Sequence, residues 1–348
     1  MKLLVSALEP SANIYLKDIL EHYHDKLDFV GIYDEKLGSP IYRSSDFAVM
    51  GILDVINKIE VAKLAIGEMI FLAKDVDKVL LIDSPAFNLP LAQSLKENYP
   101  DIEIIYYILP KVWAWKRKRV KKVEKYCDKL CSIFPFEDKF YQKSKYVGNP
   151  LLDSIKTFHQ NGQNNQIAFL PGSRKGEIKR LMPLFREVAK EFNSKKVLVV
   201  PKLFSDEQIK EYYGDIEDFE ISFDVHKSLA ESDFAYVCSG TATLEAAIIG
   251  TPFVLVYKAR KLDFWIGRKL VKLPYVGLAN ILLDFEGKEA LHDELLQDEA
   301  TKENLIKSYK NIDKERFLKA SKEIIDILKF GSRDNIIEIL KGEDKRCI

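Results

Sequence analysis

The chain has few residues of the kinds that bind metals or cross-link a fold. Only four of its 348 residues are cysteines, and no two of them form a Cys-x-x-Cys pair. The five histidines show neither the His-Glu-x-x-His pattern nor any other clustered spacing of metal ligands. Structural zinc sites and disulfide frameworks need such spacings. We therefore predict no metal site, no disulfide and no bound cofactor.

Long apolar runs and an excess of charge are also missing. No apolar run approaches the roughly 18 residues of a membrane-spanning helix, and the run from Leu3 to Val5 is too short for the core of a signal peptide. We therefore expect a cytoplasmic protein. Basic and acidic residues balance at 53 each, so the net charge gives no sign of a nucleic-acid partner. The glycine motifs of dinucleotide and P-loop sites are absent as well.

The chain does contain an alternation of short apolar strands with helical segments, at a length that suits two domains of about 150 residues each. In the first half we expect strands at 2–7, 29–32, 79–82, 104–107 and 130–133, with helices at 11–23, 57–74 and 89–98. This alternation predicts a doubly wound parallel sheet. The polar stretch at 151–166 has little to bury, and we place a linker there.

The alternation restarts after this linker. We expect strands at 167–170, 197–200, 219–223, 234–237 and 253–256, with helices at 177–192, 225–231 and 241–249. After about residue 300 only helical periodicity remains, at 314–329 and 333–341. We therefore place the first domain at residues 1–160, the second at 161–312 and terminal helices at 313–348. These helices have no sheet of their own and should pack on the first domain or on a second subunit.

The stretch Ser239-Gly240-Thr241 lies between a buried strand and a helix of small residues. A helix that opens on this turn presents free N–H groups at its positive end, and Gly240 lets a ligand approach the main chain closely. The pattern predicts a phosphate site, and Glu245, one turn further on, could bind the two hydroxyls of a ribose. Ser, Thr and Glu are also ordinary residues of a first helical turn, which is the purely structural alternative.

Ligands of open α/β sheets bind beyond the carboxyl ends of the strands, so the residues after each strand are informative. After the strand at 167–170 come Gly172, Ser173 and Arg174. The planar guanidinium of Arg174 could hold a phosphate through two N–H groups, which a lysine cannot do. Arg174 could instead be an exposed arginine at the start of a helix. Its place opposite Ser239 in a parallel sheet favours a diphosphate contact.

In the first half, the strand at 79–82 ends in Asp83, beside a turn fixed by Pro85. A carboxylate at this edge could act as a general base in a cleft between the domains. Glu9, after the first strand, lies at the same edge, and either acid could be the base. Asp83 could instead cap the turn that follows it. Asn88 could hold a sugar hydroxyl or cap the helix it begins.

A third turn, at residues 110–122, interleaves basic residues with Trp113 and Trp115. Lys116, Arg117 and their basic neighbours could bind a nucleic acid, a phosphorylated ligand or an anionic membrane surface. A solvated helix face is the ordinary alternative for such a run of charge, although two neighbouring tryptophans favour a binding role.

Two other segments suggest contact with lipid. Residues 260–269 form a second patch in which basic and aromatic residues alternate. The helical segment at 59–74 holds more apolar residues than one core-facing stripe needs. This helix is therefore either buried all round or presents an apolar face to a membrane.

The motifs form a series that covers nearly the whole chain. The series consists of segments 48–51, 82–88, 107–115, 147–150, 170–174, 239–245, 256–258 and 293–297. In this order they resemble the lipid-A-disaccharide synthases, glycosyltransferases that join two acylated glucosamines. The Trp113-Ala114-Trp115 block and the segment from Ser239 to Glu245 are specific, whereas Gly-Ser-Arg alone would be a weak match.

The resemblance implies the GT-B fold, with two Rossmann-like, doubly wound parallel-sheet domains facing a central cleft and the donor nucleotide on the second. It implies transfer from UDP-2,3-diacylglucosamine to 2,3-diacylglucosamine 1-phosphate (lipid X), which forms a β-1,6-linked disaccharide 1-phosphate and UDP. It also implies a peripheral place on the cytoplasmic face of the inner membrane. The family's swapped terminal helices would make the C-terminus a homodimer contact.

The resemblance also implies roles for particular residues. Asp83 is the expected base, with Glu9 as the other candidate. Acceptor or membrane contacts are expected at Asn88, Trp113, Trp115, Lys116 and Arg117. Donor contacts are expected at Gly172, Ser173, Arg174, Ser239, Gly240, Thr241 and Glu245, with Asn280, Glu294 and Gln297 as further candidates.

The chain departs from the family pattern on the acceptor side. The family usually has Gly-Glu-x-Ser-Gly-Asp after its first strand, whereas residues 8–13 keep Glu9 and Ser11 but lose both glycines and the acid. The second acid of the family's Asp-x-Pro-Asp-Phe-Asn block is Ala86 here. Neither change removes Asp83, Glu9 or Arg174.

The sequence leads to the hypothesis of a metal-independent, inverting displacement in which a carboxylate deprotonates the acceptor. One rival is a GT-B transferase for another lipid-linked sugar, or a UDP-sugar epimerase, which would lack the Trp-Ala-Trp block. A rival of another class is a non-catalytic membrane or lipid-binding protein, which would bind vesicles and leave the donor intact.

Overall fold

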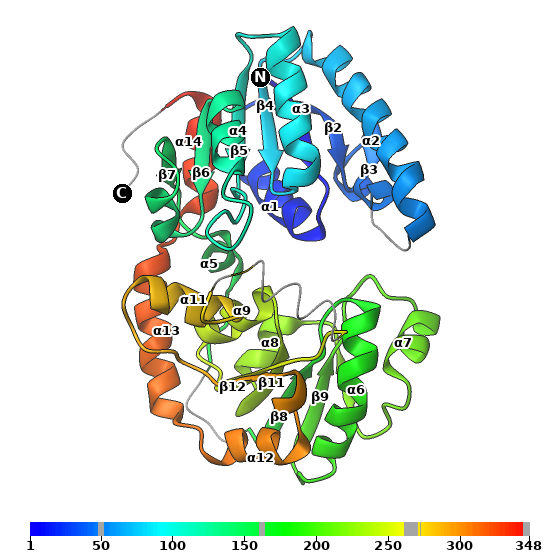
Figure 1. Ribbon diagram of the computed structural model, residues 1–348, viewed down its shortest axis with the longest axis vertical. Helices are drawn as coiled ribbons and strands as arrows, with labels where there is room; N and C mark the ends of the chain where they lie inside the picture. Colours follow the sequence, from blue (N-terminus) through cyan, green and yellow to red (C-terminus); the bar gives the residue numbers. More distant parts are fainter. Residues whose placement is uncertain (48–51, 160–163, 261–270, 272, 344–348) are drawn as a thin grey trace. The chain divides into compact units, whose positions relative to one another are not determined.

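The structure, a computed structural model, describes residues 1–47, 52–159, 164–260, 271 and 273–343. It divides into two compact units. The first consists of Met1–Asp153 together with Leu328–Ile348, and the second is Ser154–Ile327. Each unit contains one parallel sheet covered by helices (Figure 1).

The first sheet has seven strands in the order β3-β2-β1-β4-β5-β6-β7, and every neighbouring pair is parallel. The strands are β1 (Lys2–Ala7), β2 (Asp28–Tyr33), β3 (Tyr42–Arg43), β4 (Lys78–Ile82), β5 (Glu103–Tyr107), β6 (Lys129–Ser132) and β7 (Ser144–Tyr146). The chain order reverses between β1 and β4, where Ala7 and Ile82 are register partners. Loops that leave such a switch point diverge, which makes it the usual ligand site of an open sheet.

Alternate residues of these strands point to opposite faces of the sheet. One face buries Leu81, Ile104 and Tyr106 against apolar residues of α2 (Ile52–Ala73), α3 (Pro85–Asn98) and α4 (Arg119–Tyr126). The other buries Leu80, Ile105 and Tyr107 against α1 (Pro10–His22) and α14 (Ser332–Lys341). Both faces are covered, so the strands are apolar almost throughout, as parallel strands usually are.

The second sheet has six parallel strands in the order β10-β9-β8-β11-β12-β13. They are β8 (Gln166–Leu170), β9 (Lys195–Val199), β10 (Glu220–Ser222), β11 (Phe234–Cys238), β12 (Phe253–Tyr257) and β13 (Glu294–Leu296). The order reverses between β8 and β11, where Leu170 and Val237 are register partners. The α-helices that the structure describes in this unit are α6 (Lys175–Ala189), α7 (Asp206–Tyr213), α8 (Val225–Ala230), α9 (Thr241–Ile249), α11 (Leu278–Phe285), α12 (Lys302–Lys310) and α13 (Lys314–Leu328).

The prediction of two doubly wound parallel-sheet domains with a helical C-terminus is confirmed. Sequence periodicity did not predict the short strands β3, β7 and β13, nor the helices α4, α7, α11 and α12, which carry little apolar pattern or are brief. Among the helices that the structure describes, none is both long and apolar enough to cross a bilayer.

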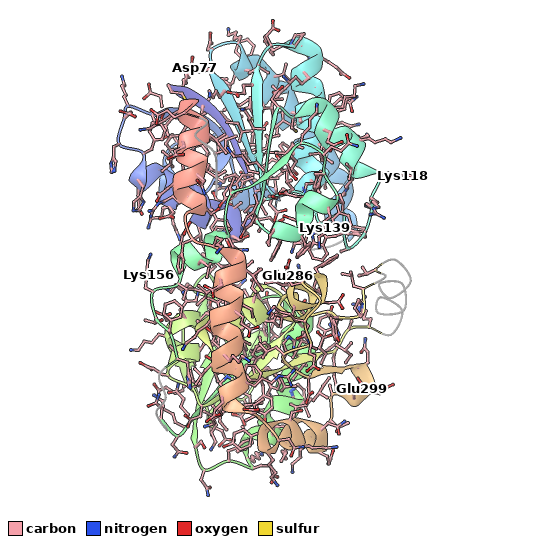
Figure 2. The ribbon with its side chains drawn as sticks, turned by 90° about the vertical axis from the view of Figure 1, so that its left-hand side faces the viewer. Asp77, Lys118, Lys139, Lys156, Glu286 and Glu299 are labelled. Atoms are coloured by element: carbon pink, nitrogen blue, oxygen red, sulfur yellow. The ribbon has the colours of Figure 1, made fainter. Side chains whose placement is uncertain are left out.

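The chain passes between the two units at α5 (Pro150–Ser154) and at the end of α13, whereas the sequence placed these boundaries at 160/161 and 312/313. The two terminal helices therefore go to different units. Ser321 of α13 donates to the carbonyl of Ile248 in the second unit, and α14 buries Ile336 and Leu340 in the first. Figure 2 shows both helices in red tones. A homodimer through them stays a prediction.

Candidate active site

Asp83 lies at the switch point of the first sheet, directly after β4. Its backbone is left-handed (φ 50°), as is that of Ser84 (φ 44°). The N-cap of α3 is Ser84, so Asp83 lies just before this helix. The alternative reading of the sequence, in which Asp83 caps the turn that follows it, agrees with one contact of its side chain. Its carboxylate accepts a hydrogen bond of 2.8 Å from the N–H of Ser84.

Burial raises the pKa of the Asp83 carboxyl above its ordinary value. The ammonium of Lys111, on the exposed turn after β5, opposes this shift, as does the hydrogen bond from the N–H of Ser84. A carboxyl in a half-buried place with a raised pKa is suited to take up a proton.

Glu9, the second candidate base, lies across the same switch point. It is exposed, and its extended backbone forms the N-cap of α1. The carbonyl of Glu9 accepts from the amide of Asn13 (3.0 Å), which also donates to the carbonyl of Ala7 (2.9 Å). Asn13 stands where the family pattern has an acid, and its amide braces the altered turn at residues 8–13.

Asn88 was expected to hold a sugar hydroxyl or to cap α3, and the structure gives it neither role. Its side chain is fully buried in the first turn of α3. The amide donates to the carbonyl of Asp83 at 2.8 Å, and its oxygen accepts from Ser6 at 2.6 Å. Both ends of the side chain are therefore occupied by protein groups.

The Trp-Ala-Trp block divides into a buried and an exposed tryptophan. Trp113, expected at an acceptor or membrane surface, is buried, and its Nε1 donates to Oε1 of Glu137 at 3.0 Å. Trp115 is 40% exposed, with the ammonium of Lys116 4.2 Å from its ring centroid and the guanidinium of Arg119 at 5.4 Å. Only Trp115 is therefore available for surface contact.

We name the surface segment from Trp115 to Arg119 the basic turn. Arg117 lies over the ring of Phe140 at 5.1 Å, and Lys118, labelled in Figure 2, is exposed. The second basic patch expected from the sequence begins at Arg260, but residues 261–269 lie outside the described residues, as does the segment 48–51.

At the switch point of the second sheet, the loop after β8 carries the glycine and arginine of the predicted diphosphate site. Gly172 is left-handed (φ 98°), and a Cβ there would come within 2.8 Å of Oε2 of Glu177. Arg174 is the N-cap of α6 with 82% of its side chain exposed, and its Nη1 pairs with Oε1 of Glu177 at 3.0 Å. The neighbouring Ser173 is exposed too.

The loop after β11 lies on the other side of this switch point. Gly240, with φ 143°, is the N-cap of α9, and no side chain caps the helix. Thr241 is the first helical residue. A Cβ at Gly240 would meet no atom of the described residues within 4 Å, so these residues leave the approach to the first turn of α9 open. Ser239 and Thr241 flank this approach, and the uncapped N–H groups of the first turn are the donors that an anion site at a helix N-terminus uses.

Glu245 lies in α9 with 16% of its side chain exposed. Its Oε1 is 3.8 Å from Nε2 of His226, a residue of α8 that sequence reasoning had not connected with the site. A strand and a loop separate the two residues along the chain, so no local spacing could have paired them.

Two of the three weaker donor candidates brace the fold. The carboxylate of Glu294 accepts from the N–H groups of Val276 and Gly277 and from the amide of Asn280. Asn280 is fully buried, and its oxygen accepts from the N–H groups of Leu291 and His292. Both residues therefore stabilise the start of α11, and every polar atom of their side chains already has a hydrogen-bond partner in the protein.

Gln297, the third candidate, is left-handed at the carboxyl end of β13 (φ 53°). Its Oε1 accepts from the N–H of Ala259 at 3.3 Å. Its Nε2 is buried and has no hydrogen-bond partner among the residues described. Gln297 therefore still has a donor that a ligand could use.

Comparison with known proteins identifies the family. A family model described as lipid-A-disaccharide synthetase matches residues 3–340. The chain is 46% identical to a lipid-A-disaccharide synthase of Campylobacter jejuni (strain RM1221), covering 97% of this chain and 98% of the relative. It is 47% identical to one of Helicobacter pylori (strain G27), covering 96% of each.

Solved structures with the same two-domain architecture also match the chain over nearly its whole length. MurG of Acinetobacter baumannii matches with a TM-score of 0.57 at 14% identity, over 98% of this chain and 99% of that one. The S. aureus MnaA–UDP co-structure matches with a TM-score of 0.60 at 16% identity, over 99% and 96%. These likenesses establish the GT-B fold. With two Rossmann-like domains, polar groups at both switch points and a family match over nearly its whole length, the chain belongs to the lipid-A-disaccharide synthase family of glycosyltransferases.

Proposed function

We propose that this enzyme transfers 2,3-diacylglucosamine from its UDP derivative to 2,3-diacylglucosamine 1-phosphate. The 6-hydroxyl oxygen of the acceptor attacks the anomeric carbon of the donor from the face opposite UDP. The new C–O bond forms as the bond to UDP breaks, a base takes the hydroxyl proton, and the configuration inverts. The products are the β-1,6-linked disaccharide 1-phosphate and UDP.

Asp83 is the proposed base, and its position carries this proposal. It lies at the switch point of its sheet, just before α3. Its carboxylate has no ion-pair partner among the described residues. Its raised pKa makes the carboxylate a better proton acceptor than an exposed one. Glu9 lies at the same switch point and is the alternative base. The Asn88 side chain is buried and hydrogen-bonded inside the domain, so we do not include it among the proposed acceptor contacts.

Arg174 and the first turn of α9 are the proposed diphosphate site of the donor. Charge builds on UDP as it leaves, and a guanidinium with uncapped N–H groups can stabilise that charge. The Arg174 side chain is largely exposed and can move to a ligand, because Glu177 is its one ion-pair partner among the residues described. Ser173, Ser239 and Thr241 supply hydroxyls beside these groups, and we propose that Glu245 binds the ribose.

We propose that two surfaces of the first domain dock the enzyme on the cytoplasmic face of the inner membrane. Ala65 and Met69 bury the inner face of α2, while Leu64 and Phe71 on its outer face are 65% and 64% exposed. The helix therefore buries one face in the core and presents two large apolar side chains on its outer side, where lipid could contact them. The basic turn adds cations and Trp115, which suit an anionic headgroup layer.

The reaction is tested by incubating the protein with the two proposed substrates in detergent and EDTA, with UDP release and product mass followed together. Disaccharide formed in EDTA supports both the reaction and the metal-independent mechanism. Disaccharide formed only when a divalent metal is restored contradicts the metal-independent part. UDP-sugar conversion without an acceptor would instead point to an epimerase, and vesicle binding without turnover to a non-catalytic lipid-binding protein.

The base is tested by comparing Asp83→Asn with Glu9→Gln. Loss of a general base lowers kcat by about 10²- to 10⁴-fold, so Asp83→Asn should lose that much while UDP still binds as in wild type. Full activity of Asp83→Asn with inactive Glu9→Gln would transfer the role to Glu9.

A further inference from the structure

The turn after β4 holds two consecutive non-glycine residues in the left-handed region, Asp83 and Ser84. This conformation is unfavourable for a residue with a Cβ and persists only where the surroundings enforce it. The direction of the Asp83 side chain follows from this backbone, because φ and ψ set where Cβ lies relative to the sheet. Whatever holds the backbone of residue 83 therefore also places its carboxylate.

Two buried donors hold the carbonyl of Asp83. The hydroxyl of Tyr106 donates to it at 2.8 Å, and the amide of Asn88 donates at 2.8 Å as well. A carbonyl oxygen has two lone pairs, so both are used. The N–H of Asp83 in turn donates to the carbonyl of Tyr107 at 3.0 Å.

The donors themselves are fixed by their own partners and packing. Tyr106 and Asn88 are both fully buried, one in the central part of the sheet on β5 and the other in the first turn of α3. Ser6 of β1, also buried, donates to the oxygen of Asn88 at 2.6 Å and so turns the amide N–H₂ toward Asp83. The contacts thus join three neighbouring elements to one carbonyl.

We propose that Tyr106 and Asn88 are positioning residues that hold Asp83 in its left-handed conformation and thereby aim its carboxylate at the acceptor hydroxyl. The inference rests on the proposed function, since it assigns Asp83 the role of base. Neither residue touches the reacting atoms. Burial raises the pKa of the Tyr106 hydroxyl well above its ordinary value, so the hydroxyl stays a donor over the working range of pH.

The neighbouring tyrosine offers a matched control. Tyr107 follows on the same strand, is equally buried, and points to the opposite face, where its hydroxyl bonds to Ser332 at 2.8 Å. The Tyr107→Phe change removes one buried hydroxyl bond and keeps the backbone carbonyl that Asp83 uses. Tyr106→Phe also removes one buried hydroxyl bond, but that bond ends on Asp83.

The test compares Tyr106→Phe, Tyr107→Phe and Ser6→Ala with wild type in kcat, in KM for each substrate and in thermal stability. Misplacing a reacting group by about 1 Å costs up to about 100-fold in rate. We therefore expect Tyr106→Phe to lower kcat by about 10-fold or more, with an unchanged KM for the UDP-sugar. Ser6→Ala should lower kcat by less, because Asn88 stays in place, and Tyr107→Phe should keep the wild-type kcat.

Equal kcat values for Tyr106→Phe and Tyr107→Phe would overturn the inference. So would a Tyr106→Phe protein that loses kcat, donor affinity and thermal stability together, since that pattern belongs to general loosening of the domain. If the wild-type protein makes no disaccharide, the proposed function fails and the positioning role with it. That outcome is distinct from failure of the inference alone, in which wild type and both phenylalanine variants are equally active.

Discussion

Nε1 of Trp113 lies 3.0 Å from Oε1 of Glu137 and donates a hydrogen bond to it, and both side chains are buried in the first domain. The other carboxylate oxygen accepts from the N–H groups of Ile133 and Phe134. Burial nevertheless raises the pKa of Glu137 from 4.5 to about 7, with Lys111 as the one cation that opposes the shift among the described residues. This acid joins the Trp-Ala-Trp segment to the loop after β6.

The raised pKa predicts a pH-dependent stability. The folded state binds this proton more tightly than the unfolded chain, so the contribution of Glu137 is fully present below about pH 4.5 and is lost as the pH rises through about 7. The shift corresponds to about 3 kcal/mol. Glu137→Gln cannot ionise, and its free energy of unfolding should fall less than that of wild type between about pH 5 and about pH 8.

Urea unfolding followed by tryptophan fluorescence measures this difference. Glu97→Gln, a change at an exposed glutamate, is the control and should follow wild type. An identical pH response of wild type and Glu137→Gln would show that the buried acid does not titrate as expected.

Replacing Lys111 should change the pH dependence of turnover. Lys111 lowers the pKa of Asp83, so Lys111→Met should raise this pKa and move the acidic limb of the kcat/KM profile to higher pH. Lys118→Met is the control, because it removes an exposed lysine of the same loop that does not influence Asp83. Coinciding profiles for the two variants would exclude electrostatic tuning by Lys111.

The exposed guanidinium of Arg174 should matter for its shape as well as its charge. Arg174→Lys keeps the charge and loses the planar pair of donors, so we expect about a tenfold weaker affinity for UDP, or about 1.4 kcal/mol. Arg186→Lys, at the other end of α6, is the control; its guanidinium bonds to the carbonyl of Tyr213. Titration calorimetry with UDP measures both. Unchanged binding by Arg174→Lys would place the diphosphate elsewhere.

The outer face of α2 should govern vesicle binding without affecting the fold. Leu64→Ser combined with Phe71→Ser removes apolar surface that is already exposed, so the melting temperature should stay close to wild type. Each such side chain contributes up to about 1.5–3 kcal/mol when buried in an apolar phase, so cosedimentation with anionic vesicles should fall at least about tenfold.

Leu203→Ser is the matched control, because Leu203 in the second domain is exposed to the same degree, 65%, as Leu64. If Leu203→Ser weakens vesicle binding as much as the α2 variant, the apolar face of α2 is not the docking surface.

Most strands and helices of this fold could be predicted because local sequence patterns determine them. Apolar runs and helical periodicity fix the main strands and helices, and the residue that follows each strand is known once the strand is known. Asp83, Arg174 and Ser239 could therefore be located at the edge of a sheet before any coordinates. The strand β13 was not predicted, because a run of three residues is too short to show a periodic pattern.

Side-chain roles were harder to predict where they depend on partners distant in sequence. Trp113 lies in a basic segment of the kind expected at a surface. It is nevertheless buried, and it donates a hydrogen bond to Glu137, which is 24 residues away in the sequence. Asn88, Asn280 and Glu294 are polar residues near the sites, but their hydrogen bonds are made to backbone and side-chain groups inside the domains. Residue type and spacing cannot distinguish a polar group that is available to a ligand from one that already has hydrogen-bond partners within the protein.

The first domain is completed by α14, which the chain reaches only after it has traversed the whole second domain. Ile336 and Leu340 of this helix fill the same side of the first sheet as α1. On the ribosome, residues 1–153 therefore emerge long before the helix that covers them, while the second domain can form in one continuous stretch. Until α14 has emerged, the part of this apolar face that α14 covers stays exposed to solvent, while α1 can already cover the rest.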